Sequence, residues 1–230
     1  MTQSILVFDF DGTVALGDGP VCSYARHIVA RDSAVSYEDL ISDLERPAGA
    51  LDGYDLVARR ARAAGADAST LDAAYLASRA QLATPESPVC APRGLDVFLA
   101  ALRGRARRVL ATNAPAIRID EALAALGLAD VFDEVLTDVG KPAGMSGYLD
   151  GLPAGARVLS IGDIWVNDLA PAHQRGHATA LVGTADVPAT AAPDHRAAGV
   201  ADLYEVIEAW VDAAHDLART PSLPSSPHHP

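Results

Sequence analysis

The chain has 230 residues, a length that allows one domain with a large insertion or two modest domains. Of these residues 50% are hydrophobic and 21% charged, as is typical of a soluble globular protein. The formal net charge of -12 argues against the basic face that nucleic-acid binding requires, so we expect no nucleic-acid partner. No apolar stretch approaches the length of a membrane span and residues 1–10 lack a signal-peptide pattern, so we expect a cytoplasmic protein without a membrane partner.

The first predicted strand is Ser4–Phe8, an apolar run that ends abruptly in acidic and glycine residues. This is the pattern of a buried parallel strand that runs into a loop. No strand is predicted in the following interval, which has four amphipathic helices at residues 21–30, 37–45, 51–64 and 69–82. We interpret residues 16–90 as a helical insertion whose ends lie close together, with hinges near Gly17 and residues 85–92.

Apolar runs beyond the insertion predict strands at residues 108–111, 134–136, 157–161 and 178–182. Helical spacing of apolar residues predicts helices at residues 94–102, 116–126, 165–175 and 203–214. Strands that alternate with helices predict an α/β fold with a parallel sheet covered on both faces. The core then comprises residues 1–15 and 91–216, and we expect the tail at 217–230, which is rich in Pro and Ser, to be disordered.

Polar residues follow four of the predicted strands, at the carboxyl ends where open parallel sheets bind ligands. They are Asp9, Asp11 and Gly12 after the first strand, Thr112 and Asn113 after the second, Lys141 after the third, and Asp163 and Asp168 after the fourth. Taken singly, each has a structural explanation as a turn former, a helix cap or a surface charge. Their coincidence at four successive strand ends favours a functional site.

Lys141 differs from every other cationic side chain of the sequence, because it is the only lysine among 18 lysine and arginine residues. This exception indicates a place that needs a compact ammonium charge, where a planar guanidinium would not fit. A phosphate contact beside carboxylates is such a place. A local positive site is also needed because the overall negative charge of the protein would repel an anionic substrate.

The order of these motifs resembles the haloacid dehalogenase-like phosphohydrolase superfamily. The resemblance covers about residues 5–182 and rests on the run Asp9-Phe10-Asp11-Gly12-Thr13, then Thr112, then Lys141, then Gly162-Asp163 with Asp168. It implies a Rossmann-like, doubly wound core, and it implies that the insertion is a small all-helical cap. It also implies a phosphatase that forms an aspartyl-phosphate, a route that splits one difficult displacement into two easier ones.

The resemblance implies a role for each residue of the predicted site. Asp9 would be the nucleophile and Asp11 the general acid/base, which its position two residues further along an extended segment allows. Gly12, Thr112, Asn113 and Lys141 would contact the phosphoryl group. The cofactor would be Mg²⁺, held by Asp9, by the Asp11 backbone carbonyl and by Asp163, with support from Asp168 through water or Lys141.

Several alternatives remain open at this point. A sugar-phosphate mutase uses the same residues and differs mainly in excluding water, whereas the dehalogenases of the superfamily lack an acid/base aspartate at the position of Asp11. A phospho-acceptor signalling domain would be about half this length and has no cap. A catalytically silent binding protein is a further possibility, although every core residue is present.

The substrate class that we expect is a small phosphorylated metabolite, acted on by a monomer or homodimer, with specificity supplied by the insertion. Aromatic and basic residues on its predicted helices are candidates for leaving-group contacts: Tyr24, His27, Arg31, Arg46 and Tyr54. For each of them, as for Trp165 near the site, packing or surface exposure is the competing explanation. We expect the insertion to open and close about its two linkers and so to exclude water during phosphoryl transfer.

Overall fold

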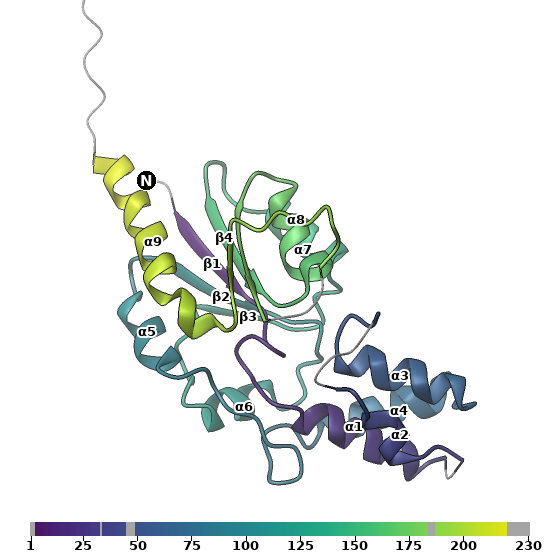
Figure 1. Ribbon diagram of the computed structural model, residues 1–230. Helices are drawn as coiled ribbons and strands as arrows, with labels where there is room; N and C mark the ends of the chain where they lie inside the picture. The colour runs from purple at the N-terminus through teal and green to yellow at the C-terminus, as the bar shows by residue number, and fades with distance from the viewer. Residues whose placement is uncertain (1–2, 33, 45–48, 184–186, 220–230) are drawn as a thin grey trace, which may run out of the picture.

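The computed structural model describes residues 3–32, 34–44, 49–183 and 187–219. Its centre is a six-stranded sheet in the order β3-β2-β1-β4-β5-β6, in which every neighbouring pair is parallel (Figure 1). The strands are β1 (Ser4–Phe8), β2 (Arg107–Ala111), β3 (Glu134–Leu136), β4 (Arg157–Gly162), β5 (Ala178–Val182) and β6 (His195–Ala197). The five predicted strands are confirmed. β6 was not predicted, because His195 and Arg196 leave it without an apolar run.

β1 lies in the middle of the sheet, and all five of its residues are buried. Leu6 and Phe8 belong to one hydrophobic cluster, whereas Ile5 and Val7 belong to another. This division follows from the alternation of side chains along a strand. A strand covered on both faces is apolar throughout, which explains why β1 was visible in the sequence.

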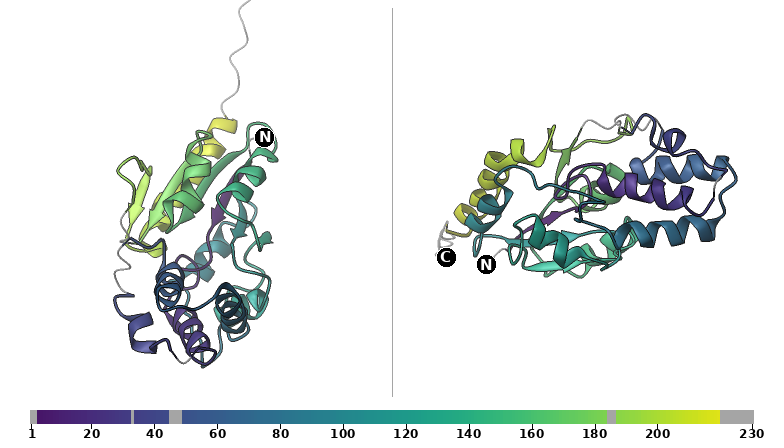
Figure 2. Two further views of the ribbon diagram at one scale, coloured as in Figure 1. Left: turned by 90° about the vertical axis from the view of Figure 1, so that its right-hand side faces the viewer. Right: turned by 90° about the horizontal axis from the view of Figure 1, so that it is seen from below.

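Helices cover the two faces of the sheet, as Figures 1 and 2 show. The cluster around Leu6 and Phe8 also contains side chains of three helices: α5 (Leu95–Ala101), α6 (Ile119–Ala125) and α9 (Tyr204–Arg219). The cluster around Ile5 and Val7 contains side chains of two others: α7 (Ala143–Asp150) and α8 (Ala170–His173). The core is therefore a Rossmann-like, doubly wound α/β fold, which confirms the predicted fold class.

Two helical segments of the core differ from the prediction. The single helix expected at 165–175 is a π-helical turn, η1 (Trp165–Leu169), followed by the α-helix α8. The first turn of α8 contains Pro171, which has no backbone N–H group to continue the hydrogen bonds of a preceding helix. Helix α7 was not predicted, because its glycines lower helix propensity. Gly144 is required there, since a Cβ atom at this position would lie 1.6 Å from the carbonyl oxygen of Val139. A short 3-10 helix, η2 (Val200–Leu203), precedes α9.

We call residues 16–90, which lie between β1 and α5, the helical insert, and four helices lie in its described part. They are α1 (Gly19–Val29), α2 (Tyr37–Ile41), α3 (Gly53–Ala63) and α4 (Ala68–Arg79). The insert packs around a hydrophobic cluster of its own, separate from those of the sheet, and lies to one side of the sheet (Figures 1 and 2). Ser36, Asp52 and Asp67 cap the starts of α2, α3 and α4 by accepting backbone hydrogen bonds. Helix α2 ends at Ile41, so it is shorter than the predicted 37–45, and residues 45–48 lie outside the described chain.

The two ends of the insert lie side by side, as the sequence predicted. The backbone N–H group of Leu16 donates to Cys90 O at 2.8 Å, and that of Cys90 donates to Leu16 O at 2.9 Å. Gly19, at the start of the insert, lies against Pro88, near its end: a Cβ atom on Gly19 would lie 2.2 Å from the carbonyl oxygen of Pro88. Two adjacent segments thus connect the insert to the core.

Helix α9 extends to Arg219, so the first residues of the tail that was predicted from 217 are helical. The rest of that tail, residues 220–230, lies outside the described residues. In the part of the chain that the structure describes, no helix is long and apolar enough to cross a membrane.

Candidate active site

The register of the sheet brings the predicted site residues to one edge. Phe8, the last residue of β1, pairs with Leu110 on β2 and with Ile161 on β4. Asp9 follows directly, and its backbone N–H group donates to Ile161 O at 2.9 Å. The carboxyl ends of the three central strands therefore present their next residues together, as expected for a ligand site of an open parallel sheet.

The Lys141 ammonium lies between two carboxylates. Its Nζ atom is 2.6 Å from Asp9 Oδ1 and 2.8 Å from Asp168 Oδ1. All three side chains are buried. Lys141 therefore lies against two of the other predicted site residues and is not a surface charge.

Asp168 is held in place by further contacts. Its Oδ2 atom accepts a hydrogen bond from the backbone N–H group of Ile164 at 2.9 Å, and its backbone oxygen accepts one from Ser160 Oγ at 2.7 Å. Gly162 gives the carboxylate room, because a Cβ atom on that residue would lie 2.5 Å from the Cβ atom of Asp168. With one oxygen on Lys141 and the other on a backbone amide, Asp168 orients the ammonium.

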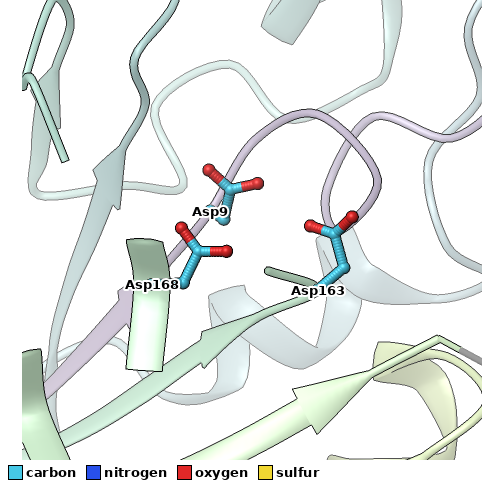
Figure 3. A group of neighbouring side chains, drawn as sticks. All are labelled: Asp9, Asp163 and Asp168. Atoms are coloured by element: carbon cyan, nitrogen blue, oxygen red, sulfur yellow. The ribbon is translucent and has the colours of Figure 1, made fainter. Parts of the chain in front are cut away.

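Asp9, Asp163 and Asp168 form a compact carboxylate group, which Figure 3 shows. One oxygen from each of them lies within 4.8 Å of the others. Asp163 packs against Gly12, where a Cβ atom would lie 2.5 Å from Asp163 Oδ2. Hard carboxylate oxygens in this number suit a Mg²⁺ ion, which takes few protein ligands and keeps several waters. The residues present thus fit the expected cofactor.

Burial and mutual repulsion shift the acidity of this group. Burial raises the pKa of Asp9 to about 7, and the charge of Asp168 adds to the increase while Lys141 opposes it. Burial, followed by the charges of Asp9 and Asp168, raises the pKa of Asp163 well above its ordinary value. Burial alone would lower the pKa of Lys141, but the charges of Asp9 and Asp168 outweigh it, so that this pKa is raised. One ammonium compensates only one of the three carboxylates, and a divalent cation beside it would compensate the other two.

Thr112 and Asn113 lie at the end of β2, beside the same carboxylates. Thr112 is buried, and its Oγ1 atom accepts a hydrogen bond from the backbone N–H group of Ala114 at 3.0 Å. Asn113 Oδ1 accepts from the backbone N–H group of Lys141 at 2.7 Å. Asn113 therefore fixes the segment that carries the lysine, a role that the sequence did not reveal. Both residues line a cavity between core and insert.

Asp11 has a different environment from the other aspartates. Arg79, the last residue of α4, places Nη1 at 3.0 and 3.2 Å from the two carboxylate oxygens of Asp11. The Asp11 carboxylate lies outside the group of three carboxylates, so only its backbone carbonyl remains for the metal role that was expected. No pattern in the sequence pointed to Arg79, which is one of 17 arginines and lies within a predicted amphipathic helix.

The cavity between core and insert joins these residues. Its walls include three residues of the insert or its loops, Asp52, Tyr54 and Tyr75. The described site residues of the core that line it are Asp9, Asp11, Thr112, Asn113, Lys141 and Asp168. Of the candidates for leaving-group contacts, Tyr54 lines the cavity, whereas Tyr24 packs against its ring at a centroid distance of 5.7 Å. His27 and Arg31 are not among the lining residues, and Arg46 lies outside the described residues. Trp165 packs with Leu169 and Leu181, in agreement with the packing explanation.

Comparison with known proteins decides the family. The sequence pattern of the haloacid dehalogenase-like hydrolases matches residues 6–189. The chain belongs to the haloacid dehalogenase-like hydrolase family. Membership in a hydrolase family favours an enzyme over the phospho-acceptor signalling domain considered above. We found no significant match among curated protein sequences.

Solved structures of this family share the fold. YfnB from Bacillus subtilis, assigned to these hydrolases and solved with bound magnesium, has 16% identity over 90% of this chain and 100% of that one, with a TM-score of 0.64. A predicted phosphoglycolate phosphatase from Haemophilus somnus has 18% identity over 90% and 99%, with a TM-score of 0.61. A 2-haloacid dehalogenase from Pseudomonas syringae has 22% identity over 91% and 100%, with a TM-score of 0.55. Identities this low establish the shared fold, and the reaction must be argued from the site.

Proposed function

We propose that this haloacid dehalogenase-like hydrolase is a Mg²⁺-dependent phosphatase that acts on a small phosphorylated metabolite through an aspartyl-phosphate on Asp9. The observation that carries the proposal is the position of the Lys141 ammonium, within 2.8 Å of both Asp9 and Asp168 and beside Asp163. A buried cation next to a carboxylate nucleophile is what phosphoryl transfer requires, because nucleophile and phosphate dianion would otherwise repel each other.

In the first half of the reaction, an oxygen of Asp9 attacks phosphorus and the bond between phosphorus and the ester oxygen breaks. Asp11 donates a proton to the leaving oxygen. Lys141 and Thr112 hold the phosphoryl oxygens, and the backbone around Gly12 and Asn113 borders them. Asp9 is well suited to the attack because β1 and the Lys141 contact fix its position before substrate arrives.

In the second half, a water molecule attacks the same phosphorus. Its proton passes to Asp11, and the bond between phosphorus and Asp9 breaks, which releases inorganic phosphate and restores both carboxyl groups. Asp11 thus serves as acid and then as base. It borders the cavity, and its carboxylate is bonded to Arg79, whereas the hydrogen bonds of the Lys141 ammonium go to Asp9 and Asp168.

Asp9, Asp163 and the Asp11 backbone carbonyl would hold Mg²⁺, with Asp168 supporting the site through Lys141. When bound, the ion would neutralise charge on the carboxylates and on the phosphoryl oxygens. The magnesium in the structure of YfnB, a protein of the same fold, supports this assignment. So does the excess of carboxylate over ammonium charge in the present site.

In this proposal the helical insert, residues 16–90, is a cap that covers the phosphate site and excludes water. Its supporting observations are the cavity walls supplied by Tyr54 and Tyr75 and the two adjacent linkers at Leu16 and Cys90. The magnesium-bound structure of YfnB reveals interdomain movement in that protein. An insert that moves about two linkers would admit substrate when open and complete the site when closed.

The test is a screen of phosphomonoesters with Mg²⁺, followed by release of inorganic phosphate. Asp9→Asn serves as the inactive variant, and Asp150→Asn, which changes an exposed aspartate on α7, serves as its matched control. The proposal fails if Asp9→Asn retains turnover. A parallel assay of 2-haloacids for halide release separates a dehalogenase, and a mutase would release little phosphate and need a bisphosphate activator.

We extend the proposal to the setting of the enzyme: a cytoplasmic monomer or homodimer without nucleic-acid or membrane partners. The acidic net charge of -12 supports the first exclusion. Light scattering during size-exclusion chromatography measures the oligomeric state, and any assembly larger than a dimer would contradict the proposal.

A further inference from the structure

Arg79 is the largest fully buried polar side chain at the boundary between insert and core. Its exposed fraction is 0%, and its Nη1 atom donates to both oxygens of Asp11 and lies 3.4 Å from the Tyr54 hydroxyl. Its guanidinium carbon lies 5.9 Å from the centre of the Phe10 ring, a cation–π distance. The guanidinium is therefore fixed from three sides.

The opposite edge of the same guanidinium has no such partners. Nε and Nη2 of Arg79 are buried, and neither has a hydrogen-bond partner among the residues that the structure describes. Buried donors are nearly always paired in folded proteins, because an unpaired one loses its hydration without compensation. Arg79 itself is not among the residues that line the cavity, but Asp11 and Tyr54, the partners of its Nη1 atom, are. An unpaired buried fork directly behind these two residues indicates a ligand that supplies the acceptors.

Two other arginines show what this edge binds in the present protein. Arg108 donates from Nε and Nη2 to the two oxygens of Asp133, at 2.9 and 2.7 Å. Arg175 donates from the same two atoms to the two oxygens of Asp150, at 2.7 and 2.8 Å. In both pairs the planar fork holds two oxygens of one anionic group. Arg79 presents the same fork without its anion.

The fork is close to the proposed reaction site. Asp11 and Tyr54, both bonded to Nη1 of Arg79, line the cavity together with Asp9 and Lys141. Lys141 is engaged by Asp9 and Asp168 at the phosphoryl end. A second anionic group on the substrate would therefore need another cation, and Arg79 lies on the insert side, where the leaving group would extend.

We infer that Arg79 determines substrate specificity by binding a second anionic group, a carboxylate or a phosphate, on the leaving group of the ester. This inference rests on the proposed phosphatase function and adds the chemical class of its substrate. Because the fork is buried in the present arrangement, the anion reaches it while the insert is displaced from the core. Closure then buries the anion between Arg79 and the cavity.

The inference is tested with phosphate esters of two- and three-carbon alcohols that end in a hydroxyl, a carboxylate or a second phosphate. Steady-state kinetics gives kcat/KM for each ester with Mg²⁺. We expect at least about a tenfold preference for one of the two anionic series, since a fork built for an anion rejects a neutral analogue. The series that is preferred identifies the anion. Equal values for all three endings would overturn the inference.

The matched variants are Arg79→Lys and Arg60→Lys, both within the helical insert. Lysine keeps the charge but has no fork of two N–H donors. The ratio of kcat/KM for the preferred anionic ester to that for the neutral ester should therefore fall close to one in Arg79→Lys and stay at the wild-type value in Arg60→Lys. If the Tm of Arg79→Lys is too low for the assay, Arg79→Gln is the second variant. A loss of the same factor on every ester would assign Arg79 a purely structural role and overturn the inference.

Binding without turnover separates this inference from the proposed function. Calorimetric titration of the Asp9→Asn protein with the same esters measures affinity when no phosphate is released. If the wild-type protein hydrolyses no ester, the phosphatase proposal fails, yet an Arg79-dependent preference in these titrations would still support the anion site. Affinities that do not depend on the charge of the ending would overturn the inference in this assay as well.

Discussion

Lys141 Nζ lies 2.6 Å from Asp9 Oδ1, although 132 residues separate the two along the chain. Asp9 directly follows β1, in the middle of the parallel sheet, and a short loop connects Lys141 to the outer strand β3. Asn113 accepts a hydrogen bond from the backbone of Lys141 at the end of this loop. The contact therefore depends on the whole order of strands from β3 to β1. It also links catalysis to stability, because the same ammonium that would assist phosphoryl transfer compensates buried carboxylates.

Replacing Lys141 should damage both properties. Lys141→Met should lower kcat by about 100-fold or more, since a preorganised charge at the transition state is lost. Without Mg²⁺ it should also destabilise the protein by about 3–5 kcal/mol, because Asp9 and Asp168 would remain buried without their cation. Urea denaturation and phosphate-release kinetics measure the two effects. Near-normal kcat in Lys141→Arg would contradict the requirement for a compact ammonium.

The stability of the Mg²⁺-free protein should fall as pH rises. Since the folded protein raises the pKa of Asp9 from 3.8 to about 7, it binds this proton more tightly than the unfolded chain does. The resulting stabilisation is full below about pH 4 and is lost as pH rises through about 7. Mg²⁺ replaces the proton, so its stabilising effect on Tm should be larger at pH 8 than at pH 5.

Asp9→Asn is the control for this pH dependence. The variant cannot ionise at this position, so its Mg²⁺-free Tm should fall less between pH 5 and pH 8 than that of the wild type. Asp163 keeps part of the dependence, because burial and the charge of Asp168 still raise its pKa in the variant. Equal slopes in variant and wild type would mean that Asp9 is not the group responsible.

Gly162→Ala should disturb the carboxylate group without removing any of its oxygens. The added Cβ atom would lie 2.5 Å from the Cβ atom of Asp168, so this side chain must shift from the position in which it contacts Lys141. We expect a loss of stability of about 1–3 kcal/mol. The Mg²⁺ concentration needed for half-maximal activity should rise as well.

Gly147→Ala is the matched control for this substitution, because nothing lies within 4 Å of its added Cβ atom and the residue is within helix α7. It should raise stability by about 0.5–1 kcal/mol, since alanine favours the helix. Mg²⁺ titrations and urea denaturation of both variants make the comparison. An unchanged Mg²⁺ dependence in Gly162→Ala would show that Asp168 tolerates displacement.

Asn113→Ala should reduce kcat through Lys141. It removes the acceptor of the 2.7 Å hydrogen bond from the Lys141 backbone, so the loop that carries the ammonium loses a fixed point. A decrease of about tenfold in kcat is expected, in line with the cost of one lost hydrogen bond at a positioned group. Asn113→Asp, which keeps an acceptor oxygen, should retain more activity. If Asn113→Ala changes KM alone, the residue contacts substrate and does not position Lys141.

Most of the core and site could be read from the sequence, because each buried strand is a continuous apolar run with its polar residues directly after it. Asp9, Thr112 and Asp163 were predicted in this way, whereas Lys141 follows β3 only after a short loop and was also singled out as the only lysine. Strand β6 was not predicted because His195 and Arg196 interrupt its apolar pattern. Helix α7 was not predicted because glycine has a low helix propensity, whereas Gly144 is required there by its close approach to Val139.

Contacts between distant helices and loops could not be predicted. Arg79 meets Asp11 across 68 residues, and this pairing depends on how the insert folds back over the core. Nothing in the local pattern of α4 distinguishes Arg79 from the other arginines of the chain. Asn113 is a similar case, since its bond to the Lys141 backbone follows from the path of a loop and from no periodicity.

The paired backbone of Leu16 and Cys90 makes the insert a replaceable module. Because the chain leaves and re-enters the core at one hydrogen-bonded pair, a tight turn in place of the intervening residues would join two ends that already touch. The insert's own cluster shares no buried residue with the clusters of the sheet, but Leu82 of the intervening segment is buried in one of those clusters. The new turn must therefore supply an apolar side chain in place of Leu82 for the grafted core to fold. Chimaeras that exchange this module between related enzymes would then transfer substrate preference while leaving the chemistry of Asp9 in place.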